Sequence, residues 1–216
     1  MSTSTEESPV DVEVRAIAAE RLTFFADAVI AIAITLLALE LPRPEGDTNA
    51  QVLHSAYEHR AEYLAFLISF LVVGAHWSGH HRVFRYVTAL DGRLPMLTMY
   101  WLLMQVLTPF ATKVLTGHGA FQVRFVFYAS VQAAAGVLFL LMVREIRRYR
   151  LYRPDTPPQM LGIAALRTFA LSGAFLVSIP LAFIPGWGHW AYVCWVAFPF
   201  AVPVVQRIVR RRSAHR

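Results

Sequence analysis

The chain has 216 residues, of which 56% are hydrophobic and only 16% are charged. Soluble domains carry about 25% charged residues, so this composition favours a membrane protein with several spans over a soluble domain. The formal net charge is +6, and a single cysteine, Cys194, excludes an intrachain disulfide and a thiolate metal cluster.

The N-terminal segment, residues 1–20, begins with polar and acidic residues. It lacks the basic and apolar regions of a signal peptide, so we expect the hydrophobic helix that follows to stay in the mature protein. We expect residues 1–20 to be cytoplasmic, with a short helix from Val12 to Glu20 leading into the membrane.

The first apolar stretch, from Arg21 to Leu41, is about as long as a helix that crosses a bilayer. The predicted span covers residues 22–41 and stops before Pro42. Asp27 lies inside it, and a carboxylate is costly in a membrane unless protein surrounds it. The span also holds small residues that let neighbouring helices approach closely: Ala26, Ala28, Ala31 and Ala33. We therefore expect this helix to lie inside an assembly.

Five further spans follow from the apolar pattern, at residues 62–81, 94–113, 121–143, 160–184 and 190–209. The loop at residues 43–60 is polar, with helical character from Gln51. Pro109 is expected to kink the third span. The predicted fold is therefore all-α: a six-helix transmembrane domain over residues 21–209, followed by a basic cytoplasmic tail at residues 210–216.

The distribution of arginine and lysine predicts the orientation of these spans. Six spans place both termini on one side, and most of the arginines lie there, including those of the linker at residues 144–158 and of the tail. The other side holds only Arg43, Arg60, Lys113 and Arg124. Both termini are therefore expected to be cytoplasmic. The basic runs are typical of topogenic and lipid-facing charge, so no nucleic-acid partner is expected.

A stripe of aliphatic residues follows one side of the first span. At about 100° per residue, Ile32, Leu36 and Leu39 share this stripe, Phe25 extends it, and Thr35 lies beside it. Such a stripe is more often helix packing than a pore lining.

Asp27 needs a partner on another helix, because Arg21 is six residues away and not in register with it. The second span offers Trp77, His80 and His81 at a similar depth, and a hydrogen bond from an indole or imidazole would offset the cost of burial. The same histidines are also consistent with interfacial anchoring. Their spacing matches one histidine box of membrane diiron oxidases, but the other boxes are missing, so no metal is expected.

Together these residues resemble the transmembrane protein 175 family of potassium channels. The resemblance rests on Arg21-x-x-x-Phe25-Ala26-Asp27 in the first span and on Trp77-x-x-His80-His81 in the second. The family has Ser where this chain has Ala26, which removes one hydroxyl from the motif.

The resemblance implies a homotetramer in which the first helix of each subunit lines a central pore, without a Thr-Val-Gly-Tyr-Gly filter. It places Ile32 at the main constriction, Leu36 and Leu39 in further rings, and Thr35 in a hydroxyl layer. It also implies a network that fixes the pore helix: Arg21, Phe25, Asp27, Trp77, His80 and His81.

The predicted function is therefore a potassium-permeable cation channel of the cell membrane, modestly selective for potassium over sodium. It is not an enzyme, takes no cofactor, has K⁺ as its permeant ion, and has the bilayer, monovalent cations and its own copies as partners. Two alternatives stay open: a histidine-dependent membrane metalloenzyme, and a proton-coupled transporter that binds its substrate at Asp27.

Overall fold

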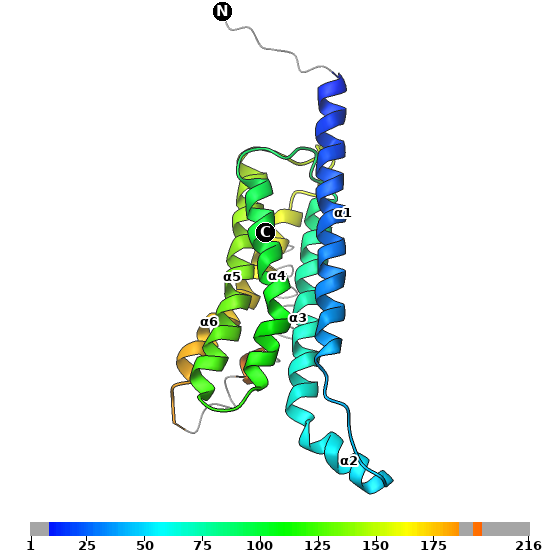
Figure 1. The fold of residues 1–216 in the computed structure, drawn as a ribbon. Coiled ribbons are helices and arrows are strands. Elements are labelled where there is room, and N and C mark those ends of the chain that lie inside the picture. The colour runs from blue at the N-terminus through cyan, green and yellow to red at the C-terminus, as the bar shows by residue number, and fades with distance from the viewer. Residues whose placement is uncertain (1–8, 186–191, 196–216) are drawn as a thin grey trace, which may run out of the picture.

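The longest element of the fold is its first helix. The computed structural model describes residues 9–185 and 192–195, and α1 runs from Pro9 to Leu39 (Figure 1). Its 31 residues rise about 46 Å, more than the roughly 30 Å hydrocarbon core of a bilayer. The helix contains no glycine, and its only proline stands at its start, where the missing N–H costs no hydrogen bond. The predicted lead-in helix and first span therefore form one continuous rod.

A short helix, α2, Asn49–Glu58, lies in the loop that was expected to be helical from Gln51. Thr48 begins it with a capping box: its hydroxyl accepts from the Gln51 backbone N–H, and the Gln51 side chain accepts from the Thr48 backbone N–H. None of its residues is buried, so α2 stands outside the packed bundle (Figure 1).

Four longer helices complete the described fold: α3, Arg60–Phe84; α4, Leu94–Thr116; α5, Phe121–Arg148; and α6, Met160–Leu181. With α1 they make five helices, within the described ranges, that are long and apolar enough to cross a membrane. The protein is therefore a multi-pass, all-helical membrane protein. The predicted sixth span lies outside the described residues except at 192–195, which are helical, and so does the tail.

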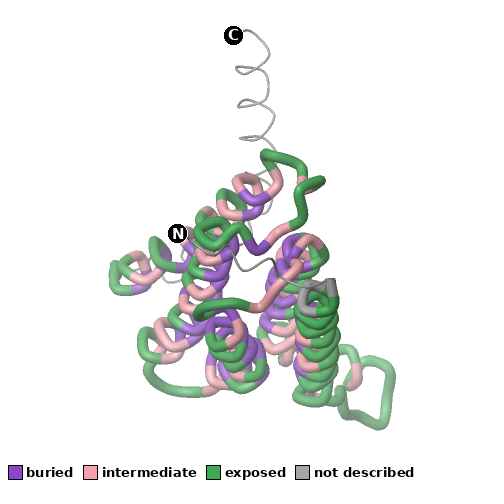
Figure 2. The backbone as a smooth tube through the Cα atoms, turned by 90° about the horizontal axis from the view of Figure 1, so that it is seen from above, coloured by how far each residue is buried: buried purple, intermediate pink, exposed green. Residues whose placement is uncertain are grey.

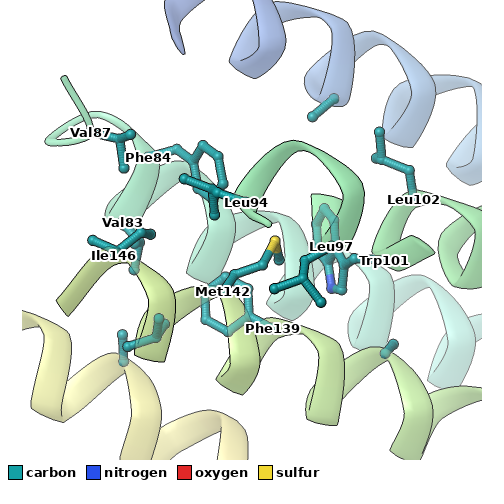
Figure 3. Packing of buried hydrophobic residues seen from close by; sticks show 14 of the residues in the cluster. Val83, Phe84, Val87, Leu94, Leu97, Trp101, Leu102, Phe139, Met142 and Ile146 are labelled. Atoms are coloured by element: carbon teal, nitrogen blue, oxygen red, sulfur yellow. The ribbon is translucent and has the colours of Figure 1, made fainter. Parts of the chain in front are cut away.

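Within the described ranges, the helices enclose two apolar clusters. In the first, α3, α4 and α5 bring large side chains together around Trp101, which packs beside Phe139 with ring centroids 6.2 Å apart (Figure 3). Buried residues of α1 join this cluster. In the second, Phe125, Tyr128 and Phe175 surround Trp195. Seen from above, α1 lies at the edge of the bundle, with much of its surface exposed (Figure 2).

The loops that follow α3 and α5 pair with each other. The Thr88 backbone N–H donates to the Leu151 carbonyl at 3.0 Å, and the Arg153 N–H donates to the Tyr86 carbonyl at 2.9 Å. At the opposite end, α4 continues through Pro109 as a single helix. The α3 and α5 loops therefore fix one end of the bundle, the end beyond which α1 extends (Figure 1).

Candidate functional site

The first helix has two unlike faces. One face packs on its own subunit through a set of buried small and aliphatic residues: Ala19, Ala26, Ile30, Ala33 and Leu37. At about 100° per residue, the centre of this set lies about 130° around the helix axis from the stripe of Phe25, Ile32 and Leu39. Ile32 is 60% exposed and Leu39 is 79% exposed, and Phe25 and Leu36 are also exposed. None of these four residues belongs to the two apolar clusters of the subunit.

Thr35 lies on the exposed side as well, one turn from Ile32. Its hydroxyl donates to the Ile32 carbonyl of the same helix at 2.8 Å. This bond uses the only hydroxyl proton, so the oxygen of Thr35 offers lone pairs, and no donor, to whatever faces the helix. A hydroxyl layer at this height would therefore accept hydrogen bonds or coordinate cations.

Asp27 lies at the side of α1 that meets α3. The Trp77 indole Nε1–H donates to Asp27 Oδ1 at 2.9 Å, and His81 Nδ1 lies 3.6 Å from Asp27 Oδ2. The Trp77 and His81 rings contact each other, with centroids 5.5 Å apart. Because Trp77 and His81 are four residues apart, one face of α3 presents both to the carboxylate. The structure therefore brings Asp27, Trp77 and His81 together.

His80, which we considered as a second partner for Asp27, faces α4 instead. It is fully buried and stacks on Trp101 and on Phe84, with ring centroids 4.7 Å and 3.9 Å away. Neither ring nitrogen of His80 has a hydrogen-bond partner in the described part of the chain. Between the two histidines that the sequence left open, His81 is therefore the one at Asp27.

Arg21 and Phe25, the other two residues of the predicted network, point away from Asp27. Both are exposed, and Arg21 makes no hydrogen bond or ion pair with another described residue. Arg21 and Asp27 are six positions apart in the chain, which places them about 9 Å apart along the helix. Within one subunit the network is therefore smaller than the resemblance implied.

The histidines of α3 do not converge on a common point. His76 and His80 are buried inside the bundle, whereas His81 is exposed beside α1. Within residues 9–185 and 192–195, no three His, Cys, Asp or Glu side chains lie close enough together to hold a metal ion.

A buried row of polar side chains runs between α3, α4 and α5. Ser69 bonds to Thr112 at 2.7 Å and to Tyr128 at 3.0 Å, and Gln132 donates to Thr108 at 3.2 Å. A third layer pairs Gln105 with His76 at 3.3 Å. Sequence reasoning did not single out this row, except for His76, because isolated polar residues in apolar spans show no pattern until the helices are in register. The row holds the three helices together.

The sequence of this chain is similar to those of known potassium channels. Residues 21–109, which run from within α1 through α3 into α4, match the model of a family described as endosomal/lysosomal potassium channel TMEM175. The chain is 30% identical to a potassium channel of Streptomyces collinus, over 76% of this chain and 82% of that one. It is 37% identical to a potassium channel of a Chryseobacterium species, over 43% of this chain and 46% of that one.

The fold also matches a solved structure. The crystal structure of a lysosomal potassium-selective channel TMEM175 homologue from Chamaesiphon minutus superposes with a TM-score of 0.68 and 26% sequence identity. The match covers 86% of this chain and 98% of that one, so it includes nearly all of the related channel.

Proposed function

Because this chain belongs to the TMEM175 family of potassium channels, we propose that it is a potassium-permeable cation channel in which α1 of four copies surrounds a central pore. The exposed face of α1 carries this proposal. A hydrophobic stripe on the outside of the bundle needs either lipid or other protein to cover it. Membership of a channel family favours other copies of the same helix as that cover.

Four such stripes around an axis would form aliphatic rings, with Ile32 at the narrowest point and Leu36 and Leu39 beyond it. An apolar ring gates by excluding water and passes ions only when it widens. No carbonyl ring replaces the hydration shell, so we propose a modest preference for potassium, the cation that sheds water more easily than sodium.

The backbone of α1 adds to the preference for cations. With both termini cytoplasmic, as the arginine distribution favours, the C-terminal ends of the four α1 helices surround the outer mouth. Each helix C-terminus carries roughly half a negative charge from its unpaired carbonyls. The outer mouth would therefore attract cations and repel anions.

The Asp27 cluster would hold each pore helix in place. The Trp77 indole donates to one carboxylate oxygen, and His81 lies 3.6 Å from the other. These contacts with α3 would fix the rotation of α1 about its axis and so the direction in which Ile32 points. Arg21 and Phe25 are exposed on α1 and would complete the network through a neighbouring copy. Relatives named as potassium channels do not favour the metalloenzyme or the transporter.

Replacing Ile32 with Asn tests the pore. We expect the variant to change potassium flux into liposomes, or the ratio of potassium to sodium flux, because an amide ring holds water where the aliphatic ring excludes it. Leu71→Asn is the matched control, because Leu71 is 61% exposed at a similar depth on α3. If Ile32→Asn and Leu71→Asn leave flux and selectivity equally unchanged, α1 does not line the pore.

A further inference from the structure

The last turn of α1 has little apolar packing within its subunit. The buried positions of the helix end at Leu37, and the three residues that follow, Ala38, Leu39 and Glu40, are all exposed. Leu39 is therefore unlike Ile32, which lies between the buried residues Ile30 and Ala33. The position of Leu39 depends on whatever holds the end of the helix.

Two polar contacts hold that end. The Lys113 ammonium of α4 lies 2.6 Å from Glu40 Oε2, and the Tyr63 hydroxyl of α3 donates to the Pro42 carbonyl at 3.0 Å. The ammonium also lies next to the C-terminus of α1, where a positive charge is favoured by the unpaired carbonyls.

Lys113 itself stands on a well-fixed part of α4. Its neighbour Thr112 is buried, bonds to Ser69 of α3, and also donates to the Thr108 carbonyl at 2.8 Å. Thr116 donates to the Lys113 carbonyl at 3.2 Å. Through Thr112 the backbone that carries the ammonium is therefore tied to α3, and the Lys113 side chain reaches out to α1.

We propose that Lys113 is a positioning residue for permeation: through Glu40 it fixes the last turn of α1 and thereby the width of the Leu39 ring. This inference rests on the proposed function, because the ring exists only if α1 lines a pore. It implies that the outer ring is set by an ion pair, whereas the Ile32 ring is set by apolar packing.

The test compares Lys113→Met and Glu40→Gln, each of which breaks the pair from one side. Positioning predicts that both variants change potassium flux, or potassium/sodium selectivity, in the same direction, by about two- to fivefold for an exposed pair. The double variant Lys113→Glu/Glu40→Lys restores the pair and should return flux toward the wild type. Lys113→Arg should also keep the ion pair and therefore leave flux close to that of the wild type.

Arg43→Met is the control for charge alone, because Arg43 is exposed nearby in the chain and has no ion pair among the described residues. If Lys113→Met and Glu40→Gln shift flux in opposite directions, and Arg43→Met matches Lys113→Met, the charge of the mouth explains the effect and the positioning role is wrong. If Lys113→Met and Glu40→Gln both keep wild-type flux and selectivity, the positioning role is also wrong.

A double-variant cycle links the effect to Leu39. In a Leu39→Ala background, Lys113→Met should have no further effect, whereas in an Ile32→Ala background its effect should persist. The outcomes also separate the two proposals. Unchanged flux in Ile32→Asn refutes the pore itself, whereas altered flux in Ile32→Asn with additive effects of Leu39 and Lys113 refutes only the role of Lys113.

Discussion

Asp27 shows how one residue can connect stability in the membrane to the geometry of a pore. Its carboxylate is partly exposed, yet the Trp77 indole N–H donates to one of its oxygens, and His81 lies 3.6 Å from the other. The hydrogen bond stabilises the charge, and because Trp77 and His81 come from the same face of α3, both contacts orient the helix. A charged residue that is unfavourable in an apolar span thus helps to set the direction in which the exposed stripe of α1 points.

We expect Trp77→Phe and Asp27→Asn to destabilise the protein non-additively. The Phe variant keeps most of the ring and removes the donor, so the cycle isolates the hydrogen bond. Because the cluster is partly exposed, we expect a coupling of about 1 kcal/mol, less than for a buried bond to a charged group. The measurement is the free energy of unfolding by SDS titration in mixed micelles. Strictly additive effects would show that the contact contributes no coupling.

The histidines mark the limit of what the sequence could predict at this scale. Depth in the membrane could be estimated by counting residues, so both His80 and His81 were reasonable partners for Asp27. Which of them faces α1 depends on the rotation of α3, and that rotation is fixed by the stacking of His80 on Trp101, a residue of another helix. The rotation of α3 is determined by its contacts with other helices, and these contacts cannot be identified from a single sequence.

At the scale of elements, α5 and α6 approach closely at Gly136. A Cβ placed on Gly136 would lie 1.6 Å from Ser172 Oγ and 2.8 Å from its Cβ. Such a contact is too short for any side chain, so this glycine sets how near the two backbones come. The close approach brings Ser172, whose hydroxyl donates to the Thr168 carbonyl at 2.9 Å, against α5.

We expect Gly136→Ala to destabilise the protein by about 1–3 kcal/mol, because the added methyl overpacks the α5–α6 contact. Gly173→Ala on α6 is the matched control, since a Cβ there meets no atom within 4 Å. Adding Ser172→Gly to Gly136→Ala should recover part of the loss. The midpoint of thermal unfolding in detergent reports all three, and equal midpoints for the two alanine variants would contradict the account.

Element boundaries were predictable to different degrees. The third, fourth and fifth spans begin where the apolar runs begin, at Leu94, Phe121 and Met160. α1 is longer than its apolar run because residues 9–20 are helical in their own right and share its axis. α5 likewise extends through the basic residues to Arg148, where cationic side chains favour a helix C-terminus. Hydropathy gives the membrane part of a helix and not its full length.

At the scale of the whole molecule, the proposed assembly accounts for residues that a single copy leaves exposed. Packing predicts which residues a subunit buries, but it does not say what covers the rest. The stripe on α1 was visible in the sequence by its spacing, and the structure adds that it points away from its own subunit. What covers that face could not be predicted from the sequence of one chain, because the covering residues belong to other molecules.

Cross-linking tests the assembly directly. In a Cys194→Ser background, we expect Ile32→Cys to form disulfide-linked dimers under mild oxidation in membranes, because rings around a narrow axis bring equivalent side chains together. Leu71→Cys, equally exposed on α3, should remain monomeric on non-reducing gels. Dimers of Leu71→Cys, or none of Ile32→Cys, would place α1 away from the axis.

The uninterrupted length of α1 has a mechanical consequence. Between Val10 and Leu39 the helix has neither glycine nor proline, so no residue along it serves as a natural hinge. Because the helix is longer than the roughly 30 Å hydrocarbon layer, we expect its polar first turns to protrude from that layer. A force applied to those turns would move α1 as one rigid body instead of bending it at a hinge.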